Sequence, residues 1–376
     1  MKKAAFLPVF VLSGAYLAYL AGSGFGSGQE ILQYFTSYGF IGILGILFSA
    51  VLWGSYAVFI VTDSRNFKLT TLHDVYIFYC GKVLGNILFG FSFAYLFCMA
   101  SLMISGAGAA FAQYFNTGTE VGRIIMTALV LLTCLLGLRK AVNVIGTLGP
   151  CIIVFVIAIA LISLINSETG LKAGQEYILS HDLLKPSGNW AWTAFMYFSY
   201  CILFQAAYLS GVANTNPAST KELKWGVIIG AIAYVIASIL MMLAFVANIS
   251  VLDGIQVPNL ALGDMINPVF GAIYGIILLA ALYTTTTPLV WSVSNVFAKE
   301  KTKWYPWVIV IVSVAAYFAS GVGSFNILVN IVTRVAAYVG ILYILPVFYV
   351  KFVKKPKPLP DADIPEGAGE DVVETD

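Results

Sequence analysis

The chain has 376 residues, of which 60% are hydrophobic and 10% are charged, and its formal net charge is +2. Soluble domains carry about 25% charged residues, so the composition excludes a soluble globular protein and indicates an integral membrane protein. The small net charge gives no reason to expect a nucleic-acid partner.

The first apolar run, residues 7–35, is long enough to cross a bilayer, and no small-residue cleavage site marks it as a signal peptide. It contains GSGFGSGQE at residues 22–30, in which the glycines alternate. Each glycine weakens a helix by about 1 kcal/mol relative to alanine, so we predict an unwound segment within the membrane. Such backbone is tolerated where it lines a cavity, as in transporters. A glycine face for helix packing is the alternative, but alternating glycines would be scattered over several faces.

The chain contains further apolar runs of spanning length. The predicted spans are 7–35, 40–62, 83–112, 121–138, 142–166, 190–212, 223–247, 267–297, 304–321 and 324–350. If the N-terminus is cytoplasmic, most of the 20 lysines and arginines fall in cytoplasmic connections, as the positive-inside rule requires. We therefore predict a multi-pass protein of a bacterial-type plasma membrane with both termini in the cytoplasm.

The ten spans divide into two equivalent halves. Residues 7–166 and 190–350 each hold five spans, and in each half a long connection (63–82 or 248–266) joins the second span to the third. Five spans per half invert the second half relative to the first, which is typical of transporters. We predict one all-α transmembrane domain, residues 1–355, with ten helices in a 5+5 inverted repeat. Residues 356–376, rich in proline and acidic residues, are expected to be a disordered cytoplasmic tail.

In this arrangement the first and sixth spans correspond, so both are predicted to be discontinuous. The sixth span carries polar residues at its middle, Ser199, Tyr200 and Gln205, although it has no glycine or proline there. In the third span, Ser101, Ser105 and Gly108 form a small-residue stripe. Close helix packing explains this stripe, and Ser101 is also a candidate solute contact.

With ten spans in two inverted fives and GSGFGSGQE in the first, the chain resembles the LeuT-type fold of the amino acid–polyamine–organocation superfamily. Within it, the glycine pattern followed by Gln29-Glu30 is most similar to the YkvI-type bacterial membrane proteins. The resemblance implies that backbone groups of Gly22, Gly24, Phe25 and Gly26 contact the substrate between the first and sixth spans. The helix that follows would present its positive end to an anionic group, such as an amino-acid carboxylate.

The eighth span contains LYTTTTP at residues 282–288. In sodium-coupled members of the LeuT-type fold, two adjacent hydroxyls at this place bind a sodium ion. The resemblance assigns the hydroxyls to Thr285 and Thr286, and the carbonyls that complete the shell to Leu282, Leu20 and Ser23. Threonines can instead bond to their own helix, next to the carbonyl that Pro288 leaves free. The fifth span lacks the lysine that some proton-coupled relatives place there, which favours sodium.

Glu30 and Arg334 are the clearest opposite charges at membrane depth, and both fall in the outer half of their spans. Isolated charges are costly there, so we predict an ion pair that forms an outer gate. Arg334 shares a four-residue spacing with Asn326, Asn330 and Tyr338, which predicts one inward-facing stripe on the tenth span. The alternatives for Glu30 are a purely structural pair, or binding of a cationic substrate or a coupling proton.

Together these features predict a secondary transporter that uses alternating access, with sodium-coupled symport of an amino acid or small organic amine. The expected partners are the solute, sodium and the lipid bilayer. No enzyme or cofactor is predicted, because His73 and His181 lie outside the spans and the five cysteines lack metal-ligand spacing. The alternatives are a proton-coupled or uncoupled transporter of a small organic cation, and a solute sensor on the same scaffold.

Overall fold

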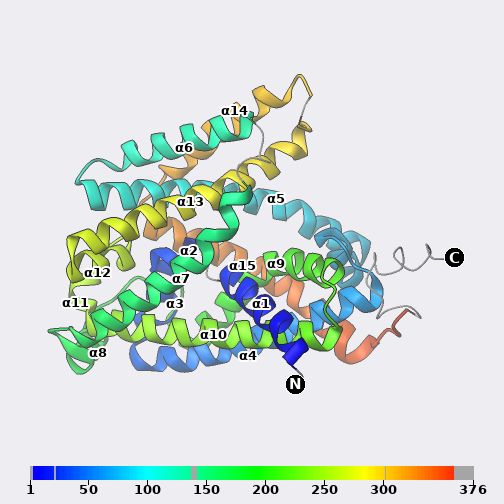
Figure 1. Ribbon diagram of the computed structural model, residues 1–376, viewed down its shortest axis with the longest axis horizontal. Helices are drawn as coiled ribbons and strands as arrows, with labels where there is room; N and C mark the ends of the chain where they lie inside the picture. Colours follow the sequence, from blue (N-terminus) through cyan, green and yellow to red (C-terminus); the bar gives the residue numbers. More distant parts are fainter. Residues whose placement is uncertain (1–2, 21–22, 137–141, 301, 360–376) are drawn as a thin grey trace.

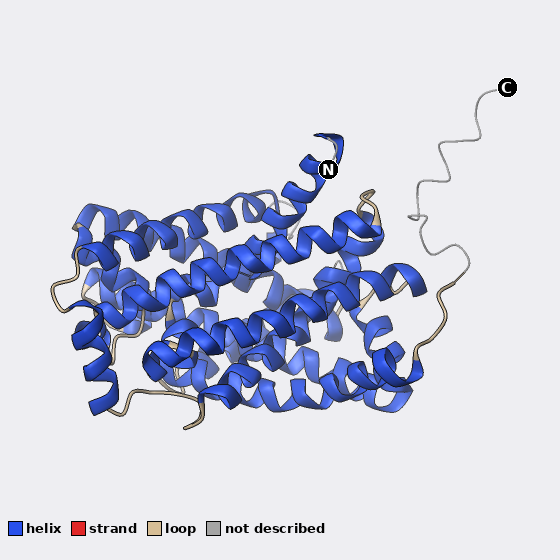
Figure 2. Cartoon of the chain, turned by 90° about the horizontal axis from the view of Figure 1, so that it is seen from below, coloured by secondary structure: helices blue, strands red, loops and turns tan. Residues whose placement is uncertain are grey.

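The computed structural model describes residues 3–20, 23–136, 142–300 and 302–359. Every regular element among these residues is a helix (Figure 2). Seven of these helices are long and apolar enough to span a membrane, and Val9–Leu20 and Tyr305–Ser320 are shorter apolar helices. Large apolar side chains such as Ile276, Ile311 and Phe318 are exposed along them, as expected of a surface that faces lipid. The chain is therefore a multi-span membrane protein.

The helices of the two halves follow one another in the order of the predicted spans (Figure 1). The first half contains α1 (Lys3–Leu20), α2 (Ser23–Ser27), α3 (Gln29–Tyr34), the 3₁₀ helix η1 (Thr36–Ile41), α4 (Gly42–Phe67), α5 (Leu72–Phe115), α6 (Thr119–Leu136), α7 (Val142–Ile165) and α8 (Gly170–Ser180). The second half contains α9 (Trp190–Thr215), α10 (Thr220–Ala247), α11 (Ile249–Leu252), α12 (Pro258–Ile266), α13 (Pro268–Phe297), α14 (Tyr305–Ser320), α15 (Phe325–Tyr349) and the π-helix η3 (Val350–Lys354).

Each of the ten predicted ranges coincides with one or more of these helices, although seven of the described helices meet the length and hydropathy requirement for a span on their own. The count of ten therefore stays a prediction. The expected connection 63–82 is largely helical instead. Helix α4 continues to Phe67, and a capping box formed by Thr71 and Asp74 starts α5 at Leu72. Gly81, with φ of 71°, then kinks α5 before its long apolar part.

Helices of the two halves pack against one another. Helix α1 packs on α10, which pairs the first span with the seventh, and α4 packs on α9, which pairs the second with the sixth. In each half a short helix precedes the third span of that half: residues 72–80 before the rest of α5, and α12 before α13. Helices α5 and α13 also pack together, with α6 and α14 along one side of them (Figure 1).

The predicted breaks in the first and sixth spans differ from the structure. Gly22 lies outside the described residues, while Ser23–Ser27 form a helical turn and not an unwound segment. A left-handed residue, Gly28 with φ of 87°, separates α2 from α3. Helix α9 is continuous, so the break predicted in the sixth span is wrong. No glycine or proline interrupts the hydrogen-bond ladder of α9 before Gly211.

Candidate solute site

A cavity of about 590 Å³ lies where the end of α1, α2 and α3 face the middle of the bundle. Of the residues assigned to the solute, the gate or sodium from the sequence, it is lined by Leu20, Gly24, Phe25, Glu30, Tyr200, Gln205 and Thr285. Its other lining residues are Tyr19, Trp53, Tyr95, Met99, Met103, Tyr197, Cys201, Phe204, Ala207, Tyr208, Tyr234 and Leu289.

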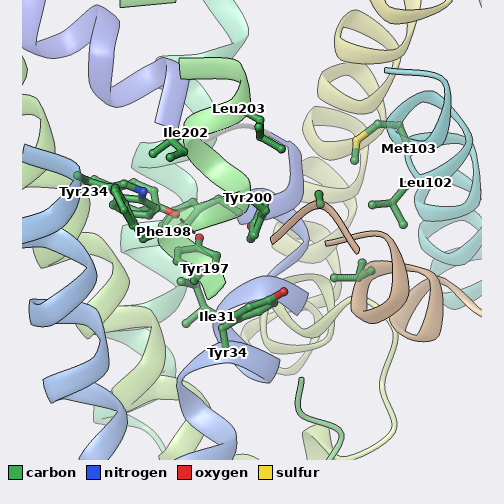
Figure 3. Close-up of a cluster of buried hydrophobic side chains, with 14 of the residues drawn as sticks. Ile31, Tyr34, Leu102, Met103, Tyr197, Phe198, Tyr200, Ile202, Leu203 and Tyr234 are labelled. Atoms are coloured by element: carbon green, nitrogen blue, oxygen red, sulfur yellow. Dashed lines mark hydrogen bonds between the residues drawn. The ribbon is translucent and has the colours of Figure 1, made fainter. Parts of the chain in front are cut away.

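Glu30 supplies the carboxylate of this cavity from the first turn of α3. The side chain folds back over α2, so that a β-carbon on Gly24 would overlap the carboxylate oxygen Oε1. The hydroxyl of Tyr197 donates a hydrogen bond of 3.3 Å to Oε2 and lies 2.8 Å from the hydroxyl of Tyr234. In Figure 3, Tyr197 and Tyr200 project from α9 beside Tyr34 of α3. Glycine at position 24 is therefore what allows the carboxylate to take this position.

Aromatic residues supply nine of the nineteen lining positions. Tyr19 stacks on Tyr208 with ring centroids 4.3 Å apart, and Tyr95 stacks on Phe204 at 4.6 Å. Ring faces carry partial negative charge, so such walls attract organic cations.

Several polar groups in this wall are buried without a hydrogen-bond partner in the described part of the chain. They are the indole nitrogen of Trp53, the hydroxyl of Tyr95, and both polar atoms of the Gln205 carboxamide. Buried polar groups are normally paired, so these atoms mark positions where a solute or ordered water completes the structure.

The predicted ion pair between Glu30 and Arg334 does not form in this conformation. Arg334 instead donates to the side-chain oxygen of Asn330 at 2.6 Å and to the carbonyl of Lys185 at 3.4 Å. Glu30 instead contacts Tyr197 of α9, while Gln33 of the same short helix is the residue that bonds to α15, through Asn330. The predicted stripe on α15 also fails at Tyr338, which is exposed.

A chain of side-chain amides closes the bundle at the end where the gate was expected. Gln33 donates to Gln29 Oε1 at 2.7 Å and accepts from Asn330 Nδ2 at 3.0 Å. Gln29 donates to the carbonyl of Ile255, and Gln33 to that of Asn326. Two glutamines spaced by four residues in an apolar segment are the sequence signal for this network, which was not predicted.

Three residues expected to contact the solute lie outside the cavity lining. The carbonyl of Gly26 accepts hydrogen bonds from Asn259, at 2.9 Å, and from Tyr274, while its α-carbon packs near Leu278. Ser101 and Ser199 each donate to the carbonyl four residues earlier in their own helix, at 3.0 and 2.7 Å. These three positions therefore serve helix packing in this conformation, as does the Phe25 carbonyl, which accepts from Asn259.

The threonines of α13 make both hydrogen bonds within their own helix and contact with the cavity. Thr286 is fully buried and donates to the carbonyl of Leu282 at 2.6 Å, which joins two of the predicted sodium ligands to each other. Thr285 and Leu20 line the same cavity as Glu30. The side chain of Ser23 lies outside the described residues.

The cavity extends from Glu30 toward the ends of α9 and α13 that are predicted to be cytoplasmic. Tyr208 and Leu289, from the C-terminal halves of these helices, line it, whereas the amide network closes the other end. The described lining of the cavity thus extends away from the amide network.

No family model matches the chain. Its sequence is 24% identical over 347 residues to the uncharacterized membrane protein YkvI of Bacillus subtilis, covering 89% of this chain and 93% of YkvI. Among solved structures, Mhp1 in an inward-facing conformation aligns with a TM-score of 0.60 at 13% identity, over 95% of this chain and 79% of Mhp1. A manganese transporter of Eremococcus coleocola aligns with a TM-score of 0.54 at 15% identity, over 93% and 81%. These likenesses confirm the resemblance of the chain to the YkvI-type membrane proteins and to transporters of the LeuT-type fold.

Proposed function

We propose that the protein is a secondary transporter that carries a small organic amine across the membrane by alternating access, coupled to sodium. The observation that carries this proposal is the Glu30 carboxylate, which reaches an aromatic cavity whose described lining contains no lysine, arginine or histidine. A charge at membrane depth is costly without a partner, so the counter-charge is expected to come from the solute.

An amine suits this site better than an amino acid. An ammonium group would pair with Glu30 and lie against the faces of aromatic residues such as Trp53 and Tyr200. The carboxylate of an amino acid would need a cationic partner or free backbone donors. Arg334 is held by Asn330, outside the lining.

The nature of the lining also separates this site from one for a divalent metal. Among the described residues, no group of three or more histidine, cysteine, aspartate or glutamate side chains is placed to hold a metal ion. A single carboxylate among aromatic rings is a poor set of ligands for a transition metal, which prefers several imidazole, thiolate or carboxylate groups.

Sodium is proposed as the coupling ion at Thr285, Thr286 and the carbonyls of Leu282, Leu20 and Ser23. Hydroxyl and carbonyl oxygens suit a hard cation, and Thr285 and Leu20 already line the cavity. The ion would then lie beside the solute, so that each would stabilise the conformation to which the other binds. Proton coupling through Glu30 is the competing arrangement.

The test is a thermal-shift screen of amines and amino acids on the purified protein, in sodium and in matched potassium buffer. The ligands that bind are then followed as uptake into proteoliposomes with and without a sodium gradient. We expect amines to raise the melting temperature, with a larger effect in sodium. Glu30→Gln should remove the shift, and the matched control Glu176→Gln, an exposed position on α8, should retain it.

Each part of the proposal can fail separately. If only amino acids bind, the choice of amine is wrong. If amines bind and are transported equally in sodium and potassium, the coupling is wrong. If no solute crosses the membrane although amines bind, the protein is a sensor on this scaffold.

A further inference from the structure

Building on the amine site proposed above, we propose that the solute is two-ended, with its ammonium group at Glu30 and a neutral hydrogen-bonding group, an amide or a hydroxyl, at Gln205. Gln205 lies on α9, in the same cavity wall as Tyr197, which contacts Glu30. The two residues thus mark two separate polar positions along one continuous cavity.

Gln205 has a carboxamide that is buried and, among the described residues, unpaired. Its side chain is 2% exposed, and neither the oxygen nor the nitrogen of its carboxamide has a hydrogen-bond partner in the described part of the chain. Leaving a buried donor or acceptor unpaired costs about 1–3 kcal/mol for each group. A carboxamide that is buried and lines the cavity is therefore expected to be completed by what occupies the cavity.

Tyr197, which contacts Glu30, and Gln205 lie at different heights along α9. Gln205 follows Tyr197 by eight residues in a continuous helix, which separates them by about 12 Å along the helix axis. Tyr200 lies between them on the same helix and also lines the cavity. A solute that reaches both ends must therefore be elongated.

The wall of the cavity near Gln205 is apolar and aromatic. Phe204 stacks on Tyr95 there, and Met99 and Met103 come from α5. An apolar or aromatic spacer fits such a wall, because it removes apolar surface from water without leaving further polar groups unpaired.

The end of the solute at Gln205 is expected to be neutral. Glu30 is the one charged residue of the described lining, so a second ammonium group would have no counter-ion at Gln205. A carboxamide both donates and accepts hydrogen bonds, and an amide or hydroxyl group of the solute can pair with both its donor and its acceptor.

The experiment compares two series of ligands on the purified full-length protein. One series is linear ω-amino amides and the other is alkylamines of the same lengths, and affinity is measured by isothermal titration. We expect the amides to bind more tightly than the matched alkylamines by roughly tenfold, the equivalent of one or two net hydrogen bonds, with the advantage confined to chains long enough to reach both ends.

Variants at position 205 then test the contact. Gln205→Leu should reduce the ratio of the two affinities to about one, and Gln205→Glu should shift the preference to diamines of the same span. Gln175→Leu is the control. The Gln175 side chain accepts a hydrogen bond from the backbone N–H of Phe40, 135 residues earlier in the sequence, and this variant should keep the wild-type ratio. Melting temperatures without ligand check that each variant is folded.

The outcomes distinguish this inference from the function on which it rests. If alkylamines bind as tightly as amino amides at every length, Gln205 holds only ordered water and the two-ended solute is wrong, while the amine site stands. If neither series binds, the amine site itself fails and this inference fails with it. A diamine preference in Gln205→Glu would support the contact even if Gln205→Leu is unstable.

Discussion

The Glu30 carboxylate lies directly against the α-carbon of Gly24, across the left-handed turn at Gly28. A β-carbon at position 24 would overlap Glu30 Oε1, so Gly24→Ala must displace the carboxylate from the cavity. Loss of a charged hydrogen bond costs about 1.5–3 kcal/mol, so amine affinity in titration calorimetry should fall by roughly 10- to 100-fold.

The matched control for this substitution is Gly54→Ala in α4. A β-carbon there has no neighbouring atom within 4 Å. Alanine in place of a helical glycine is expected to stabilise the protein by up to about 1 kcal/mol and to leave amine affinity unchanged. If Gly24→Ala binds amines as tightly as Gly54→Ala, the position of the Glu30 carboxylate does not determine binding.

The sequence alone located the helices well and their contacts poorly. Apolar runs longer than about 18 residues are a strong signal, because the bilayer sets the length of a span. The alternating glycines predicted an irregular first span, but the backbone departs from the helix at Gly28, where the ring of Phe245 leaves no room for a β-carbon. The break predicted by symmetry in α9 had no local signal, and that helix is continuous.

The candidate site shows the same division. Glu30, Tyr200 and Gln205 were found because polar residues are rare at membrane depth. Their partners could not be found, because which face of a short helix meets which neighbour depends on tertiary packing. The sequence offered Arg334 as the clearest opposite charge at membrane depth, yet Glu30 contacts Tyr197 of α9 in the fold, and Gln33 is the residue of α3 that bonds to Asn330 of α15.

The amide network predicts a variant that opens the end of the site that is predicted to face outside, called the outer end below. Asn330→Ala removes the hydrogen bonds from Asn330 to Gln33 and from Arg334 to Asn330. At about 1 kcal/mol for each, the closed outer end should lose roughly 2 kcal/mol. Cys201 lines the cavity, so its labelling by an impermeant thiol reagent from the outer side should increase, in protein whose other cysteines are alanine.

The control for the outer network is Asn326→Ala. Gln33 bonds to the backbone carbonyl of Asn326, which this substitution retains. Equal outer labelling of Cys201 in the Asn330 and Asn326 variants would mean that the side-chain network does not hold the outer end closed.

A buried ion pair at the opposite end of the bundle predicts a stability effect. Lys351 Nζ lies 2.6 Å from Asp63 Oδ1, and the side chains are 19% and 5% exposed. The hydroxyl of Tyr79 donates to the other oxygen of Asp63. Lys351→Met leaves that carboxylate buried without its ammonium partner, so we expect a loss of about 3 kcal/mol in the free energy of unfolding.

A double variant separates the pair from the individual residues. Asp63→Asn with Lys351→Met removes both charges, and its melting temperature should exceed that of Lys351→Met alone. Lys354→Met, an exposed position in the same π-helix, should change the melting temperature little. Additive losses in the double variant would show that the pair contributes no coupling.

The threonines of α13 allow the sodium proposal to be tested against a matched background. Thr286 and Thr287 both donate to the carbonyl four residues earlier, at 2.6 and 2.8 Å, so replacing either by valine removes the same kind of helix bond. Only Thr285 and Thr286 are proposed as sodium ligands.

An ion at 100 times its Kd stabilises the folded protein by about 2.7 kcal/mol. The sodium-dependent rise in melting temperature should therefore disappear in Thr285→Val and Thr286→Val and persist in Thr287→Val. Loss of the sodium effect in all three variants would point to a helix distortion, and its persistence in all three would place the ion elsewhere.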